Sequence, residues 1–148
     1  MKKLVAFAAV IAVALAAPTA VGAGQGKTKY LGQFESSGDL SFVVKKTENG
    51  KKVFNFKWEG FPLDCRGTPE TSSSNLTFSV KVKNKKFETQ AVDDQQNPGA
   101  LLKLKGELNG KTEANGTMSI EGKNVPVDSG GRKKCDSGKI DWTAATPL

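Results

Sequence analysis

The chain has 148 residues, a formal net charge of +7, two cysteines, two tryptophans and no histidine. The lack of histidine removes the commonest general base and the usual serine–histidine–aspartate arrangement. Two distant thiolates do not make a zinc site, so we expect neither metal nor cofactor. The basic excess suits an anionic partner, but lysines along solvent-facing strand positions also keep a β protein soluble and its edges unpaired.

Residues 1–23 have the pattern of a secretory signal peptide. Two lysines precede an unbroken apolar run, 4–17, and residues 21–23 fit a cleavage site with small side chains, although cleavage after residue 16 or 17 fits as well. The run is shorter than the ~20 apolar residues that a membrane-spanning helix needs. We therefore expect a secreted domain, 24–148, without a membrane span, and the short lysine-rich start indicates a bacterial protein.

The two cysteines predict a disulfide. In an exported chain, a pair of cysteines favours one intramolecular bond. We expect Cys65 to be bonded to Cys135, which ties the middle of the chain to its last strand. Two free thiols or an intermolecular bond are the alternatives.

From Thr28 onwards, apolar and polar residues alternate with a period of two, and no stretch has the period of 3.6 typical of a helix. Asn49-Gly50 and Asn109-Gly110 separate alternating runs as hairpin turns do. We expect about nine strands at 28–34, 40–45, 53–58, 76–83, 86–92, 100–108, 114–120, 125–127 and 140–144. This spacing predicts a single antiparallel β-sandwich or a partly open β-barrel.

Several local expectations bear on where a site would lie. Alternation in the third strand places Phe54, Phe56 and Trp58 together on the buried face. Residues 66–75, rich in serine with glycine and proline, are expected to form the longest and most flexible loop. Gly122-Lys123 is expected to be a turn, and residues 129–134 a loose basic loop.

Paired carboxylates, as in glycoside hydrolysis, are the remaining catalytic chemistry. The candidates are Glu59, Asp64, Glu70, Asp93, Asp94, Asp128, Asp136 and Asp141. Most of them lie in expected turns, where an aspartate caps its own backbone. We therefore assign no catalytic residue.

Five residues are candidates for ligand binding. Phe61 lies in a Gly-Phe-Pro segment and is the aromatic residue that we expect to be exposed. Trp58 could stack on a sugar ring if exposed, although alternation favours its burial. Arg132, Lys133 and Lys134 could contact an anionic polymer. We expect no nucleic acid as partner, because neither an arginine-rich segment nor an exposed aromatic ladder accompanies these lysines.

The C-terminal segment resembles that of a group of small secreted bacterial all-β proteins without an assigned activity. The shared motif is Cys135-Asp136-x-Gly138 followed by Trp142-Thr143-Ala144. Further shared segments, in the same order along the chain, are Tyr30-Leu31-Gly32, Leu40-Ser41-Phe42-Val43-Val44, Leu63-Asp64-Cys65, Lys86-Phe87, Leu104-Lys105-Gly106 and Asn115-Gly116-Thr117. The resemblance implies secretion and one disulfide, and it carries over no catalytic residue.

These observations lead to the hypothesis of a non-enzymatic cell-surface or extracellular binding module. Its partner would be an anionic cell-wall polymer or another extracellular protein. One alternative is a small secreted polysaccharide hydrolase that uses paired carboxylates. Another is an inhibitor or partner-binding domain that uses the loop expected at 66–75.

Overall fold

The computed structural model describes residues 26–93 and 99–148, and within these ranges it contains ten β-strands and no helix. The expected signal peptide lies outside the described residues. The strands are β1 (Lys27–Phe34), β2 (Asp39–Thr47), β3 (Gly50–Cys65), β4 (Thr68–Asn75), β5 (Val80–Lys81), β6 (Lys86–Val92), β7 (Ala100–Asn109), β8 (Glu113–Pro126), β9 (Arg132–Asp136) and β10 (Ile140–Ala145). In the described part of the chain, no helix is long and apolar enough to cross a membrane.

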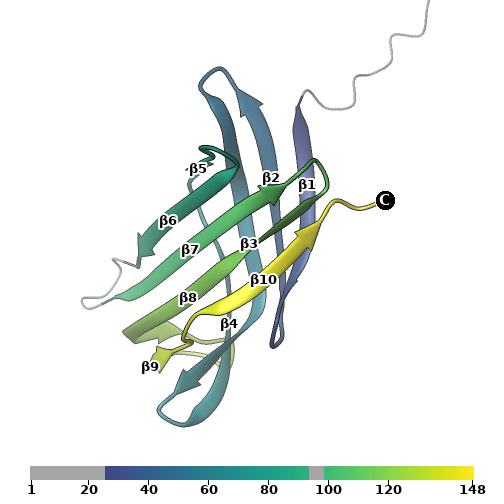
Figure 1. The fold of residues 1–148 in the computed structure, drawn as a ribbon. Coiled ribbons are helices and arrows are strands. Elements are labelled where there is room, and N and C mark those ends of the chain that lie inside the picture. Colours follow the sequence, from purple (N-terminus) through teal and green to yellow (C-terminus); the bar gives the residue numbers. More distant parts are fainter. Residues whose placement is uncertain (1–25, 94–98) are drawn as a thin grey trace, which may run out of the picture.

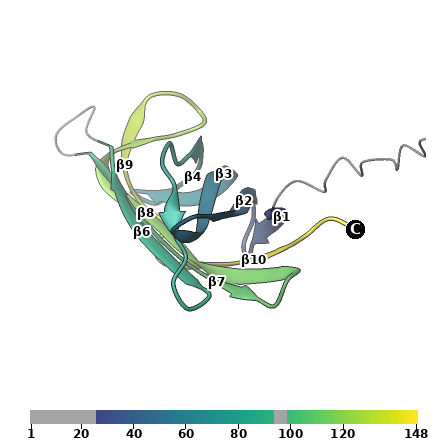
Figure 2. The same ribbon diagram turned by 90° about the horizontal axis from the view of Figure 1, so that it is seen from above.

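Six of the strands close into an antiparallel barrel in the order β1–β2–β3–β9–β8–β10 (Figure 1). β3, with 16 residues, pairs first with β2 and then with β9 along one edge; β8, with 14 residues, pairs with β10 and β9 in the same way. β7 and β6 extend the sheet beyond β8, while β4 and β5 pair with the other edge of β3. Figure 2 shows the strands wrapped around a common interior. The predicted all-β antiparallel fold is confirmed.

Aromatic rings fill this interior. Tyr30, Phe42 and Phe56 form a continuous stack, with ring centroids 4.9 and 5.5 Å apart. Trp142 packs edge-on against Phe42 and Phe56, and Phe87 of β6 contacts the same cluster. Such offset and edge-on pairs add about 0.5–1.5 kcal/mol each to the free energy gained by burial. The cluster therefore joins strands from both sides of the barrel.

A bulge in β3 changes which of its side chains face the core. Asn55 has a φ of 51°, and the pairing between β2 and β3 shifts register beside it. The extra residue reverses the alternation, so that Val53 and Phe56 are buried while Phe54 lies half-buried on the outer face. The expectation that Phe54 shares the buried face is wrong, whereas the burial of Trp58 is confirmed.

Residues 66–75 form a hairpin strand, and the expectation of a flexible loop there is wrong. Arg66 and Gly67 have φ values of 58° and 84°, which suit the two central positions of a tight hairpin turn. The chain then returns as β4, which pairs along β3 as far as Lys57. Alternation did not reveal this strand, because Ser72 is its only buried residue.

Three further expectations about elements are corrected. In the run 76–83 only Val80 and Lys81 form a strand. Alternation predicts that Leu76, Phe78, Val80 and Val82 face inward; Leu76 and Val80 are buried, but Phe78 is 44% exposed. Gly122-Lys123 is not a turn, because β8 continues through it with a shift of register against β9. The expected basic loop at 129–134 includes the start of strand β9.

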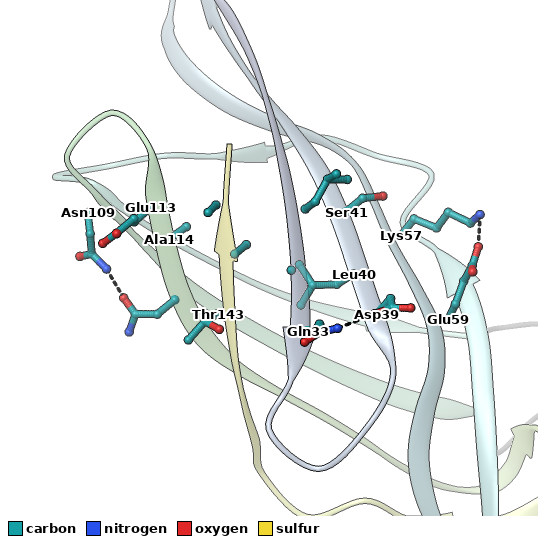
Figure 3. A pocket seen from close by; sticks show the side chains of 15 residues that line it. Gln33, Asp39, Leu40, Ser41, Lys57, Glu59, Asn109, Glu113, Ala114 and Thr143 are labelled. Atoms are coloured by element: carbon teal, nitrogen blue, oxygen red, sulfur yellow. Dashed lines mark hydrogen bonds and ion pairs between the residues drawn. The ribbon is translucent and has the colours of Figure 1, made fainter. Parts of the chain in front are cut away.

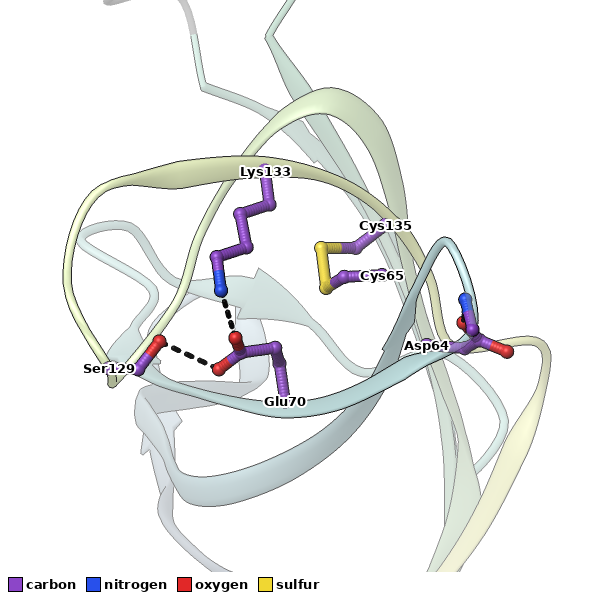
Figure 4. The surroundings of a disulfide bond; sticks show 7 residues. Asp64, Cys65, Glu70, Ser129, Lys133 and Cys135 are labelled. Atoms are coloured by element: carbon purple, nitrogen blue, oxygen red, sulfur yellow. Dashed lines mark hydrogen bonds and ion pairs between the residues drawn. A yellow bond between two sulfur atoms is a disulfide. The ribbon is translucent and has the colours of Figure 1, made fainter.

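The disulfide between Cys65 and Cys135 is confirmed (Figure 4). It joins the last residue of β3 to β9, and the neighbouring residues Asp64 and Asp136 are the only cross-strand pair between these two strands in the described chain. The bond therefore reinforces the shortest pairing in the barrel.

Candidate functional site

The two aromatic candidates are both core residues. Phe61 is 0% exposed and packs edge-on against Phe34, with ring centroids 4.7 Å apart, so the expectation of its exposure is wrong. The pairing of β3 with β4 is irregular between Trp58 and Phe61, which turns both side chains inward. Trp58 is 5% exposed. Neither ring offers a flat surface on the outside of the molecule on which a sugar could stack.

Carboxylates neutralise two of the three basic candidates. Arg132 donates from Nη1 to Oδ2 of Asp93 at 2.6 Å and to the carbonyl oxygen of Asn124 at 3.1 Å. Lys133 forms an ion pair with Glu70 (Figure 4). Lys134 is exposed. Residues 132–134 therefore do not form an open cationic patch.

Glu70 has an environment opposite to that of a general acid. Hydrogen bonds from Lys133 and from the Ser129 hydroxyl, at 2.7 Å for the latter, stabilise its charged form and lower the pKa of the carboxyl group. A glycosidase acid needs a raised pKa. Glu70 thus acts as a structural anchor between β4 and β9.

The other candidate carboxylates mostly cap turns or hold strands together. Asp64 accepts a hydrogen bond from the Gly67 amide at 2.6 Å, and Asp136 accepts one from the Gly138 amide at 2.8 Å. Asp128 accepts hydrogen bonds from the hydroxyl groups of Thr71 and Ser73 on β4. Glu59 forms an ion pair with Lys57 of the same strand, so this contact does not join two strands. Asp141 is exposed on β10, and Asp94 lies outside the described residues. The turn role predicted for Asp136 is confirmed.

An open hollow of about 870 Å³ crosses the outer face of β8, β10, β1, β2 and β3 (Figure 3). It brings together two carboxylates, because Asp39 of β2 lies directly opposite Glu59 of β3. Gln33 donates to Asp39 at 3.4 Å, and Lys57 forms an ion pair with Glu59. The sequence pattern missed this pair because Asp39 lies in an expected turn.

A row of four lysines crosses the outer face at the other end of these strands. Lys27 of β1 lies opposite Lys45 of β2, Lys45 lies opposite Lys52 of β3, and Lys52 lies opposite Lys81 of β5. Directly opposed residues point to the same side of a sheet. We call Lys27, Lys45, Lys52 and Lys81 the lysine row.

The lysine row carries no compensating carboxylate. Within 26–93 and 99–148 none of its members forms an ion pair, and the Nζ atom of Lys45 instead lies 5.0 Å from the ring centroid of Phe54. In contrast, the cations that do form ion pairs with carboxylates are Lys57, Lys86, Lys103, Lys105, Arg132 and Lys133. Like charges placed directly opposite one another destabilise a sheet. The row is therefore a concentrated positive charge that the fold itself does not neutralise.

The lysine row depends on the register between strands, which the pattern of a single strand does not give. Its four members come from four strands, and a slip of one residue in any strand would turn that lysine to the opposite face. The bulge at Asn55 also places Phe54 beneath Lys45. A period of two marks each lysine as solvent-facing but does not align it with its neighbours.

Neither a metal site nor a related protein defines the function. In the described part of the chain, no three cysteine, aspartate or glutamate side chains are arranged to hold a metal ion. Comparisons with protein-family models, curated proteins and solved structures find no match. The surface itself is therefore the basis for a functional proposal.

Proposed function

We propose that this chain is an exported bacterial binding module, without catalytic activity, that holds an anionic polymer of the cell surface on the lysine row. The observation that supports this function is the alignment of Lys27, Lys45, Lys52 and Lys81 without carboxylate partners. A row of opposed like charges costs stability, and a bound polyanion would remove that cost.

The geometry of the row suits a linear polymer. Neighbouring strands lie ~4.8 Å apart, so the four Cα atoms lie within roughly 15 Å of one another along a line across the strands. A chain of phosphates or carboxylates that lies along this line meets one ammonium group from each strand. Binding of this kind is electrostatic, and it weakens as salt shortens the screening length.

Export is the second part of the proposal. The disulfide suits an oxidising compartment outside the cytoplasm. The basic and then apolar pattern of residues 1–23 suits a signal peptide that directs the chain there. An exported chain with a net positive charge would meet the anionic polymers of the cell wall.

The test is a pull-down of the purified mature protein on insoluble bacterial cell-wall material, at low and high salt. We expect the wild type to bind at low salt and to be released at high salt. The double variant Lys45→Gln/Lys52→Gln should lose most of the binding at low salt. The matched control is Lys103→Gln/Lys105→Gln, which removes the same charge from lysines that pair with Glu121 and Glu88.

The two double variants separate the lysine row from net charge. An equal loss in both would mean that total charge, and not the row, governs adhesion. No binding by the wild type at either salt concentration would remove the proposal. Binding that survives high salt would contradict it as well, since a shaped site would then be responsible.

The Asp39–Glu59 pair supports a second candidate, hydrolysis of a polysaccharide. These two carboxylates lie opposite each other in the hollow, and a glycosidase uses two carboxyl groups that flank the scissile bond. The measurement is the release of reducing ends from cell-wall polysaccharide by the wild type, Asp39→Asn and Glu59→Gln. Release by the wild type that both variants lose would support this candidate, and no release by the wild type would rule it out.

A further inference from the structure

The hollow that contains Asp39 and Glu59 also carries a continuous row of polar side chains. Its members lie directly opposite one another on five neighbouring strands, in the order Asn115 of β8, Thr143 of β10, Gln33 of β1, Asp39 of β2 and Glu59 of β3. All five are exposed and line the hollow. Figure 3 shows Thr143, Gln33, Asp39 and Glu59 along one line across the strands. We call these five residues the polar row.

The polar row offers both donors and acceptors of hydrogen bonds. The side-chain amides of Gln33 and Asn115 and the hydroxyl group of Thr143 can do both. The ionised carboxylates of Asp39 and Glu59 accept hydrogen bonds only. A sugar hydroxyl group, like that of serine, donates one hydrogen bond and accepts others. The row therefore suits a ligand that carries hydroxyl groups along its whole length.

An apolar strip borders the polar row. Leu31 of β1 lies opposite Ala145 of β10, and both residues are exposed and line the hollow. Leu31 is 46% exposed, although most large apolar side chains in the described chain are buried. A pyranose ring has an apolar C–H face besides its hydroxyl groups, and covering Leu31 with that face removes apolar surface from water. The hollow thus combines the two kinds of contact that a sugar ring makes.

The charge of the hollow favours a neutral ligand. The charged residues that line it are Asp39, Lys57, Glu59 and Glu113, so carboxylates outnumber cations. An anionic polymer would meet like charges there, and like charges across an interface oppose binding. A neutral ligand has no such cost.

We propose that the hollow binds a neutral, extended, β-linked glycan that lies across the strands along the polar row. Neighbouring strands lie ~4.8 Å apart, which is close to the length of one sugar unit in such a chain, so successive sugars meet successive members of the row. This site is separate from the lysine row, because none of those four lysines lines the hollow. Binding needs no cleavage, so the inference holds whether or not Asp39 and Glu59 are catalytic.

The experiment is a proton–nitrogen NMR titration of the oxidised mature protein with chitohexaose and with cellohexaose, two neutral β-linked chains. We expect at least one of them to move the side-chain amide signals of Gln33 and Asn115 saturably. The signal of Gln90 should stay in place, because Gln90 is exposed on β6 and does not line the hollow. Maltohexaose is the matched ligand control, since it has the composition of cellohexaose but an α-linked, coiled shape, and it should bind at least fivefold more weakly.

A pair of glutamine variants tests the location. Gln33→Ala removes one hydrogen-bonding group from the middle of the polar row and should weaken glycan binding roughly three- to tenfold. Gln90→Ala makes the same change on another exposed strand position and should leave the affinity unchanged. Asp39→Asn and Glu59→Gln should bind nearly as well as the wild type, because their amide oxygens still accept hydrogen bonds, so glycan binding is measured apart from any release of reducing ends.

The lysine row is tested separately. Lys45→Gln/Lys52→Gln should bind the glycan as the wild type does, and polyphosphate should not move the Gln33 and Asn115 signals. Binding of only one of the two β-linked chains would support the proposal and show whether the acetamido group is required. The proposal is overturned if neither chain moves these signals, if maltohexaose binds equally, or if Gln33→Ala and Gln90→Ala have the same effect.

Discussion

Single glycines determine how closely the aromatic rings approach the sheet. A Cβ atom on Gly116 would lie 2.5 Å from Cζ2 of Trp142 and would also collide with the backbone oxygen of Lys105. Because the strand partner cannot move aside, we expect Gly116→Ala to lower the free energy of unfolding by about 1–3 kcal/mol or more. Urea denaturation measures this change. Thr117→Ala, next to it on β8, should stay within about 0.5 kcal/mol of wild type, and equal effects would contradict the steric explanation.

Glu70 should make the free energy of unfolding depend on pH in the acidic range. Lys133 and Ser129 lower the pKa of its carboxyl group in the folded state. A lowered folded-state pKa gives stability that is complete above the unfolded pKa of about 4.3 and is lost as the pH falls through the folded-state value. Wild type should therefore be more stable than Glu70→Gln at neutral pH, and the difference should shrink with acidification. Urea melts between neutral and acidic pH measure it.

The variant Lys133→Gln provides the control for this linkage. In that background the Glu70→Gln substitution should change the pH profile much less, because the main cause of the lowered pKa is gone. An unchanged pH-dependent difference between the two Lys133→Gln proteins would show that another group is responsible.

At the scale of the elements, the disulfide holds β9 to β3. The bond closes a loop of 70 residues and joins strands that share one cross-strand pair in the described chain. The chain-entropy relation for such a loop gives about 4 kcal/mol, so Cys65→Ser/Cys135→Ser should lose roughly that amount of unfolding free energy. Urea denaturation of the oxidised protein and the double variant measures it. A difference below ~1 kcal/mol would mean that the other pairings hold β9 without the bond.

Alternation of apolar and polar residues predicted the strands that have one apolar and one polar face. It missed a strand that is polar on both faces. β7 buries Leu102, Leu104 and Leu108 as the pattern predicts. β4 is polar on both faces, so only its pairing with β3 makes it a strand. In β3 a single bulge at Asn55 reverses the faces, which no local pattern indicates.

The candidate site was less predictable than the fold, because a local pattern does not show how strands align with one another. The disulfide could be predicted from the presence of two cysteines in a chain expected to be exported. To predict the lysine row one must know the register of four strands, and to predict the Asp39–Glu59 pair the register of two. The burial of Phe61 follows from the irregular pairing beside Gly60, whose φ is 66°. The pairing of strands distant in the sequence therefore determines which side chains meet on the surface and which are buried.

For the whole molecule, the placement of charge matters more than its total. The formal charge is +7, yet the ion pairs neutralise lysines on β7 while those of the lysine row lack such partners in the described chain. Each lysine that meets a polyanion releases counterions, so the logarithm of the binding constant falls linearly with the logarithm of salt concentration. The slope of that line counts the lysines that touch the polymer.

This slope should separate the lysine row from the bulk charge. With soluble polyphosphate as probe, Lys45→Gln/Lys52→Gln should reduce the slope by about 1.4–1.8, from 0.7–0.9 per charge as for nucleic acids. Lys103→Gln/Lys105→Gln removes the same formal charge but should leave the slope near that of wild type, because Glu121 and Glu88 already neutralise those lysines. Fluorescence anisotropy of labelled polyphosphate across a salt series measures all three proteins. Equal slopes for the two double variants would place the contact elsewhere on the surface, since only a polymer seated on the row distinguishes these two pairs of lysines.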